Sequence, residues 1–289
     1  MVLNGQKIED IKEVYSHPMA LLQCMELGKN KTRRRSGITS LLLWIKQRRA
    51  YSMTEEKMRK IPIRNPELIE ILDDFVSLRN EDPESFERWM HVSCKDQRTN
   101  RHHWTGDDYL REIISLGNRH EGYPDSMYGY EFRVSNKKHR FFKNEFPETQ
   151  EEAKWRADFI RKMGRLNEEI MSFLGTRNNA LTAIYPPGGY ISWHNNANAC
   201  AYNFIFSYSE TGDGGFSYWD VDKQEVVFMQ DEPGWQLKAG YFGHYGEPEK
   251  LMYHMAESDC WRHTISFCFN EQEASAEYRE QVIDEISSE

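Results

Sequence analysis

Hydrophobic residues in the first part of the chain follow a helical period. Between Asn65 and Met90 they recur in steps of three and four, at positions 68, 69, 72, 75 and 76, which places their side chains on one face of a helix. Asn65 precedes Pro66 and Glu67, an order typical of a helix N-terminus with Asn as the cap. Residues 1 to about 120 are therefore predicted to form a mostly helical N-terminal region.

A second helical pattern covers residues 148–174 and predicts a long amphipathic helix. Gly175 follows the pattern and is the expected stop. The predicted apolar stripe consists of Trp155, Phe159, Met163, Leu166, Ile170 and Phe173 or Leu174.

From Asn179 onward the hydrophobic period changes to two. The segments "ALTAIY", "AYNFIFSYS", "GFSYWD", "EVVFM", "GWQLKAGYF" and "WRHTISFCF" alternate with turn residues, which is typical of short strands. Six such strands in about 90 residues favour a two-sheet jelly roll or a small barrel. The predicted fold class is α+β, with this core in a domain of residues 121–289. That domain also holds the helix 148–174 and an acidic C-terminal surface helix in residues 274–289.

Composition and charge narrow the possible partners and cellular compartments of the protein. The net charge of −9 argues against general affinity for nucleic acid, and no apolar run is long enough for a transmembrane helix. No signal-peptide pattern opens the sequence, and five scattered cysteines without a C-x-x-C pair favour a reducing compartment. We therefore expect a cytoplasmic protein. The oligomeric state stays open.

One segment departs from this acidic balance. Residues 29–64 hold 12 Lys and Arg against two Glu. Most charge runs are solvated faces. Contact with nucleic acid is a second interpretation. An acidic partner, including the chain's own C-terminal region, is another.

The candidate chemistry lies in two histidines and the start of one strand. His194 follows the turn-rich "AIYPPGGYISW", and His254 comes sixty residues later. In the next predicted strand, Arg262, Thr264 and Ser266 share one face, and His263 lies on the other. A guanidinium inside a barrel needs an anion, and beside a hydroxyl it suits a carboxylate.

These residues resemble the iron(II)/2-oxoglutarate-dependent oxygenases, most closely their prolyl-4-hydroxylase-like branch. The family order is a Tyr-x-Pro-Gly hairpin before His-x-Asp, then a Gly-Gly strand pair, a Pro-x-x-Gly turn, a distal His and a basic residue with Ser or Thr. The match covers roughly residues 178–270, and the order and strand context are more specific than any single motif. The corresponding segments here are Tyr185-Pro186-Pro187-Gly188-Gly189, His194, Gly214-Gly215-Phe216, Lys238-Ala239-Gly240, His254 and Arg262-His263-Thr264.

The resemblance implies a double-stranded β-helix (jelly roll) and a site that uses Fe(II), 2-oxoglutarate and O2. His194 and His254 correspond to metal ligands, and Arg262 with Thr264 or Ser266 to the cosubstrate anchor. Tyr185 and Asn203 correspond to further cosubstrate contacts. The chain departs from the family at the third ligand, because Asn196 stands where the family has a carboxylate.

Asn196 leaves three interpretations open. The amide oxygen binds iron weakly, water or a halide fills the position, or the metal is lost. The expected activity is hydroxylation of a peptidyl or amino-acid substrate with release of succinate and CO2. The alternatives are a catalytically inactive jelly-roll binding protein and a nucleic-acid-modifying or halogenating variant of the family.

Overall fold

The structure is a computed structural model that describes residues 57–94, 100–120, 122–132, 141–176, 178–196, 202–243, 246–269 and 276–289, together with the backbone of residues 2–3 and 6–7. The chain divides into two compact units, Met1–Glu56 and Lys57–Glu289. In the first unit β1 (Val2–Leu3) pairs antiparallel with β2 (Gln6–Lys7). The basic segment up to residue 56, Asn198 and His244 lie outside the described residues.

Eight strands of the second unit form two antiparallel sheets. In chain order they are β6 (Asn178–Tyr185), β7 (Gly189–His194), β8 (Tyr202–Ser209), β9 (Gly214–Asp220), β10 (Glu225–Gln230), β11 (Gly234–Tyr241), β12 (His254–Ser258) and β13 (Arg262–Phe269). One sheet has the order β6-β13-β8-β11 and the other β7-β12-β9-β10. Strands that follow one another in the chain thus mostly alternate between the sheets, which is the winding of a double-stranded β-helix. The predicted jelly roll is confirmed.

Short strands from earlier in the chain extend both sheets. β5 (Met127–Glu131) pairs with β7 and then with β6, and so joins the sheets along one side. β3 (Met58–Ile61) adds to the free edge of β11, and β4 (Ser93–Cys94) pairs with β5. The sequence analysis did not predict these three strands, since each is only two to five residues long.

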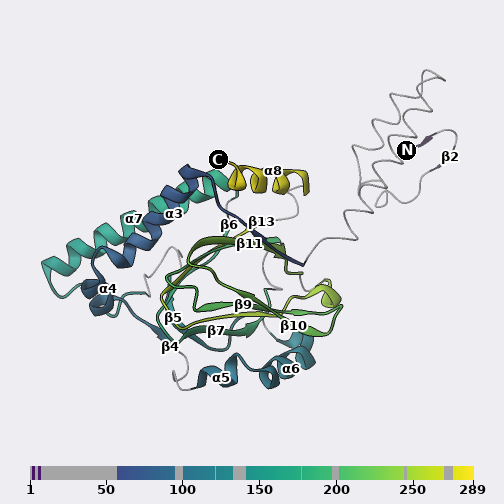
Figure 1. The fold of residues 1–289 in the computed structure, drawn as a ribbon, viewed down its shortest axis with the longest axis horizontal. Coiled ribbons are helices and arrows are strands. Elements are labelled where there is room, and N and C mark those ends of the chain that lie inside the picture. Colours follow the sequence, from purple (N-terminus) through teal and green to yellow (C-terminus); the bar gives the residue numbers. More distant parts are fainter. Residues whose placement is uncertain are drawn as a thin grey trace. The chain divides into compact units, whose positions relative to one another are not determined.

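Helices cover the outer faces of both sheets (Figure 1). α3, α7 and α8 lie over the first sheet, and α5 and α6 over the second. The helices of this unit are α3 (Pro66–Asn80), α4 (Pro83–Trp89), α5 (Arg101–Trp104), α6 (Asp107–Leu116), α7 (Gln150–Leu174) and α8 (Ala276–Ser287), with 3-10 turns η3 (Gly117–Arg119) and η4 (Pro248–Lys250).

The two long helices begin and end where their sequence signals lie. The Asn65 side chain accepts a hydrogen bond from the Leu68 amide, 3.0 Å away, which satisfies one of the free donors of the first turn of α3. Thr149 caps α7 in the same way. Gly175 ends α7 in the left-handed conformation, with φ of 61°, where glycine carries no Cβ penalty.

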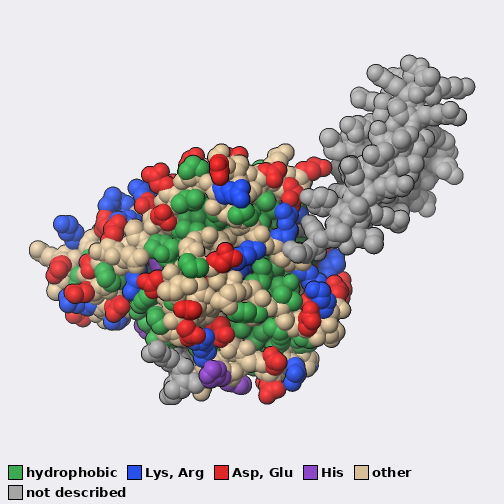
Figure 2. Space-filling model, in the orientation of Figure 1, with side chains coloured by type: hydrophobic (Ala, Val, Ile, Leu, Met, Phe, Trp, Pro, Cys, Tyr) green, Lys and Arg blue, Asp and Glu red, His purple; other side chains and the backbone are tan. Residues whose placement is uncertain are grey.

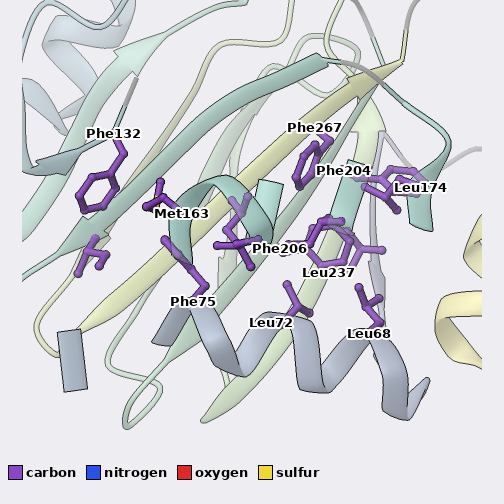
Figure 3. Close-up of a cluster of buried hydrophobic side chains, with 14 of the residues drawn as sticks. Leu68, Leu72, Phe75, Phe132, Met163, Leu174, Phe204, Phe206, Leu237 and Phe267 are labelled. Atoms are coloured by element: carbon purple, nitrogen blue, oxygen red, sulfur yellow. The ribbon is translucent and has the colours of Figure 1, made fainter. Parts of the chain in front are cut away.

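The main hydrophobic core lies between the first sheet and these helices (Figure 3). Leu68, Leu72 and Phe75 of α3 pack with Met163 and Leu174 of α7 against the sheet. Their partners on the sheet are Phe204, Phe206, Leu237 and Phe267. Since these aromatic residues point to the helices, the alternate residues of the same strands point between the sheets.

Two features differ from the sequence analysis. The compact units divide at residue 56, whereas the sequence analysis placed a boundary at about residue 120. α3 packs on α7 and on the sheet, so it belongs to the same core as the jelly roll. α8 was expected to be a surface helix, but its residues Val282, Ile283 and Ile286 are buried in that core.

The surface of the second unit carries both charges. Lys and Arg are interspersed with Asp and Glu on the face shown in Figure 2. The described part of the basic segment binds acids of its own chain: Lys57 contacts Asp220 at 2.9 Å, and Arg59 contacts Glu280 of α8 at 2.5 Å. No described helix has the length and apolar character needed to cross a membrane.

Candidate functional site

Two histidines meet at one end of the second sheet. His194 is the last residue of β7 and His254 the first of β12, and they are direct cross-strand partners. Their ring centroids lie 4.2 Å apart. Metal–imidazole bonds are about 2 Å long, so one ion can bind both rings.

A β-bulge aims His194 into the space between the sheets. The pairing of β7 with β12 shifts register between His254 and Ala256. Ile191 packs between the sheets with Ala183 and Tyr185 of β6, and strict alternation would therefore turn His194 outward. The extra residue in β7 restores the inward direction, a known use of bulges beside functional sites.

Backbone carbonyls fix the tautomer of both rings. Nδ1 of His194 lies 2.8 Å from the Ser192 carbonyl oxygen, and Nδ1 of His254 lies 3.1 Å from that of Met252. A carbonyl only accepts, so each Nδ1 carries the proton and each Nε2 keeps its lone pair. Metal-binding histidines show this arrangement.

Burial keeps both imidazoles neutral. It lowers the pKa of His194 to about 4, and burial together with the neighbouring His194 lowers the pKa of His254 well below its ordinary value. Phe216 stacks on His254 with ring centroids 5.6 Å apart, and Phe242 meets it edge-on at 4.7 Å. The pair is thus available to a cation without a competing proton.

The third ligand position holds no carboxylate. Asn196 is the second residue after β7 and is partly exposed, while its neighbour Asn195 is fully buried. Within the described ranges, no three His, Cys, Asp or Glu side chains form a metal-binding group. Asp213 and Asp220, which lie at the two ends of β9, are engaged elsewhere: Asp213 accepts from Thr211 and Asp220 binds Lys57. The donors that the structure brings together are the two imidazole nitrogens.

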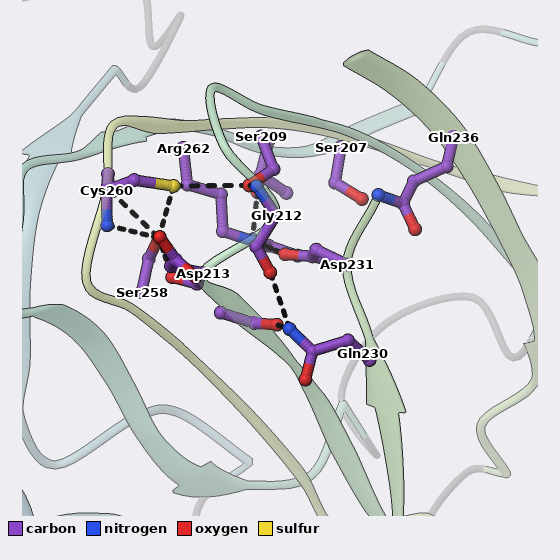
Figure 4. Close-up of polar contacts among 12 residues, drawn as sticks. Ser207, Ser209, Gly212, Asp213, Gln230, Asp231, Gln236, Ser258, Cys260 and Arg262 are labelled. Atoms are coloured by element: carbon purple, nitrogen blue, oxygen red, sulfur yellow. Dashed lines mark hydrogen bonds and ion pairs between the residues drawn. The ribbon is translucent and has the colours of Figure 1, made fainter. Parts of the chain in front are cut away.

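Arg262 lies between the sheets in a buried network (Figure 4). Its Nε donates to Asp231 at 2.6 Å and its Nη1 to the Thr264 hydroxyl at 2.5 Å. Its Nη2 is buried and has no hydrogen-bond partner among the described residues. A buried donor without a partner is costly, so this nitrogen marks a place for an acceptor.

Lys238 joins the same network from β11. Its Nζ lies 2.7 Å from Asp231, 3.2 Å from Ser207 and 3.2 Å from Gln236. Although burial raises it, Arg262 and Lys238 hold the pKa of Asp231 below its usual value. Two cations and one anion leave the network with a formal excess of one positive charge.

Tyr185 adds a second donor. It is the cross-strand partner of Arg262, whose Cζ lies 5.8 Å from the centre of the tyrosine ring. The phenol is buried with no hydrogen-bond partner in the described part of the chain, and burial raises its pKa well above the ordinary value. The carboxylate expected from the sequence matches these donors and this charge in its chemistry, since it accepts hydrogen bonds and carries one negative charge.

The remaining predicted residues lie on the same inner face but farther from Arg262. Ser266 is buried two residues beyond Thr264 on β13. Asn203 lies opposite Cys268, six residues along β13, which is about 20 Å at 3.3 Å per residue. The structure therefore brings Arg262, Thr264 and Tyr185 together, and Asn203 does not join them.

The sequence analysis missed Asp231 and Lys238. The segment Lys238-Ala239-Gly240 lies inside β11 and pairs with both β8 and β3. It is therefore part of the predicted strand "GWQLKAGYF", and the family's Pro-x-x-Gly turn was matched to it wrongly. Gln236 and Lys238 alternate with the apolar Leu237 and Ala239, and all four are buried. This alternation was the sequence signal that placed the side chain of Lys238 on the opposite face from Leu237. Asp231 follows β10 in a loop, and no pattern marks it.

Comparisons with known proteins add likenesses of fold only. No protein-family model matches the sequence, and no curated protein matches it. A Pseudomonas putida prolyl-4-hydroxylase aligns with 71% of this chain and 99% of its own, at 12% identity and a TM-score of 0.27. The viral collagen prolyl hydroxylase of Paramecium bursaria chlorella virus-1, in its 2-oxoglutarate complex, aligns with 57% of this chain and 92% of its own, at 14% identity and a TM-score of 0.23. TM-scores this low carry no weight for function.

Proposed function

We propose that the protein is an iron(II)/2-oxoglutarate-dependent oxygenase that hydroxylates a peptidyl or amino-acid substrate. His194 and His254 hold the metal, with the amide oxygen of Asn196 at the third position. Arg262 and Tyr185 bind the far carboxylate of 2-oxoglutarate. The proposal rests on one observation. The same interior holds two imidazoles whose Nδ1 atoms bind backbone carbonyls, and a buried guanidinium with one nitrogen that has no hydrogen-bond partner among the described residues.

When bound, ferrous iron and 2-oxoglutarate supply the activation of O2, and the reaction releases succinate and CO2. The chain contributes position and exclusion of water. The Ser192 and Met252 carbonyls orient the two rings, and Phe216 and Phe242 enclose His254 on two sides. The Thr264 hydroxyl fixes one arm of Arg262, so its free nitrogen has a defined direction.

Asn196 sets the expected strength of metal binding. A neutral amide attracts a divalent cation less than a carboxylate does, because the ion is the largest charge in such a site. The two imidazoles and the two chelating oxygens of the cosubstrate still provide four donors. We therefore expect iron to bind weakly to the protein alone and more tightly when 2-oxoglutarate is present.

An anaerobic iron titration with 2-oxoglutarate tests this proposal. A weak visible charge-transfer band is expected in the wild type and in a His102→Ala control, which alters an exposed histidine. His194→Ala and His254→Ala should abolish the band. Succinate release is then measured against a panel of peptides, amino acids and nucleotides. A protein with neither the band nor succinate release rules out the oxygenase.

A non-catalytic binding protein is the second candidate. The absence of a carboxylate ligand in the described site favours it, since the free donors of Arg262 and Tyr185 suit a carboxylate without any metal. It predicts 2-oxoglutarate binding that does not depend on iron and no succinate. A nucleic-acid substrate remains a prediction that depends on the segment 29–64, most of which lies outside the described residues.

A further inference from the structure

We propose that Asp231 and Lys238 are positioning residues that set the charge of the buried cluster around Arg262, so that it accepts one singly charged carboxylate. Neither residue touches the ligand. The identification of that ligand with the far end of 2-oxoglutarate rests on the proposed function, whereas the charge selection does not.

The hydrogen bonds of Lys238 exclude it as a direct anchor. An ammonium group has three donors, and Asp231, Ser207 and Gln236 occupy all three. The side chain is fully buried. Its role is therefore to hold one oxygen of Asp231 in place.

Asp231 in turn holds the guanidinium of Arg262 in place. Its second oxygen accepts from Nε of Arg262 at 2.6 Å, and Thr264 holds Nη1 from the other side. Of the donating nitrogens of the guanidinium, only Nη2 lacks a partner within the described residues. The nitrogen that is free to donate lies on the strand that pairs with Tyr185.

The formal charges decide which ligand fits. Arg262 and Lys238 carry two positive charges and Asp231 one negative charge, and all three side chains are at most 1% exposed. A buried excess of one charge is costly until an anion neutralises it. A carboxylate supplies one negative charge, whereas a neutral amide supplies none.

Binding of glutarate to the metal-free chain tests the proposal, with glutardiamide as the neutral control. Ligand-observed NMR at pH 7 suits this test because burial leaves the pKa of Lys238 at about 8, so that the amine is charged. The wild type should bind glutarate and not the diamide. Lys238→Met leaves Arg262 and Asp231 with a net formal charge of zero, and it should weaken glutarate binding at least about tenfold.

Two further variants separate charge from folding. Lys238→Arg keeps the charge and should retain most of the binding. The double variant Asp231→Asn/Lys238→Met leaves the single positive charge of Arg262 in the cluster. It should bind glutarate more tightly than Lys238→Met does. Thermal unfolding of each variant identifies any that fail to fold, and the double variant then decides. Unchanged binding in Lys238→Met, or no recovery in the folded double variant, overturns the proposal.

The same experiment keeps the two proposals apart. Glutarate binding involves no metal and no oxidation, so its dependence on Lys238 is independent of turnover. A chain that binds glutarate as expected but gives no charge-transfer band with iron would contradict the oxygenase and leave the charge selection intact.

Discussion

At the scale of single residues, Asn196 is the departure with the largest chemical consequence. It follows His194, the last residue of β7, by two positions. The carbonyl-bound Nδ1 atoms and the aromatic rings around His254 are features that metal-binding histidines share. On the proposed function, this residue sets how strongly the ion is held, while the two imidazoles set its location.

Asn196→Asp should tighten iron binding by at least about tenfold, since it restores an anionic ligand at the metal. The measurement is the iron dissociation constant from an anaerobic titration. Asn80→Asp, which adds the same charge at the exposed end of α3, serves as the control and should have no effect. An unchanged constant in Asn196→Asp would mean that this side chain points away from the metal.

Arg262→Lys should raise the KM for 2-oxoglutarate by at least about tenfold while the iron dissociation constant stays the same. Lysine keeps the charge but cannot reach Asp231, Thr264 and a ligand in the same planar geometry. Steady-state kinetics across 2-oxoglutarate concentrations measure the effect. Equal KM values for the variant and the wild type would remove Arg262 as the anchor.

At the scale of elements, the bulge in β7 and the alternation of side chains along β13 turn the residues of the candidate site toward the space between the sheets. The order of motifs was sufficient to predict that His194, His254 and Arg262 lie in one jelly roll, and the alternation of β13 correctly separates Arg262 from His263. The latter packs on Phe75 of α3 with ring centroids 5.4 Å apart. The bulge could not be predicted, because a one-residue register shift leaves no periodic signal. Asp231 was missed for a related reason, since its role depends on a loop conformation.

Phe75→Ala tests how far the helical layer stabilises the sheet. Phe75 is fully buried, and truncation of such a residue costs about 3–5 kcal/mol of unfolding free energy. Urea unfolding measures the loss. Phe146→Ala, at a side chain that is 74% exposed, is the matched control and should change stability by no more than about 0.5 kcal/mol. A small effect at Phe75 would contradict the packing of α3 on the sheet.

At the scale of the whole molecule, residues 57–289 form one compact unit, and the candidate site lies between its two sheets. The interior is unusually rich in buried titratable groups. His194, His254 and His263 are all neutral in the folded chain because burial lowers their pKa values, to about 4 for His194 and about 3 for His263. This makes global stability sensitive to acid.

The free energy of unfolding should fall as the pH drops from about 6.5 toward 4. In that window the unfolded chain protonates its histidines, near their ordinary pKa of about 6.5, while the folded chain does not, so protons favour unfolding. His263→Phe, which suits the aromatic surroundings of that ring, should reduce the slope by up to about 1.4 kcal/mol per pH unit. Urea unfolding at several pH values measures it, and identical slopes in the variant and the wild type would contradict the buried neutral state.

The most direct test of the central claim is the position of iron in crystals prepared anaerobically with Fe(II) and 2-oxoglutarate. Anomalous scattering at the iron edge should show one peak per chain, about 2 Å from Nε2 of both His194 and His254. The far carboxylate of the cosubstrate should lie against Nη2 of Arg262. Iron bound elsewhere, or bound by only one of the two rings, would contradict the account.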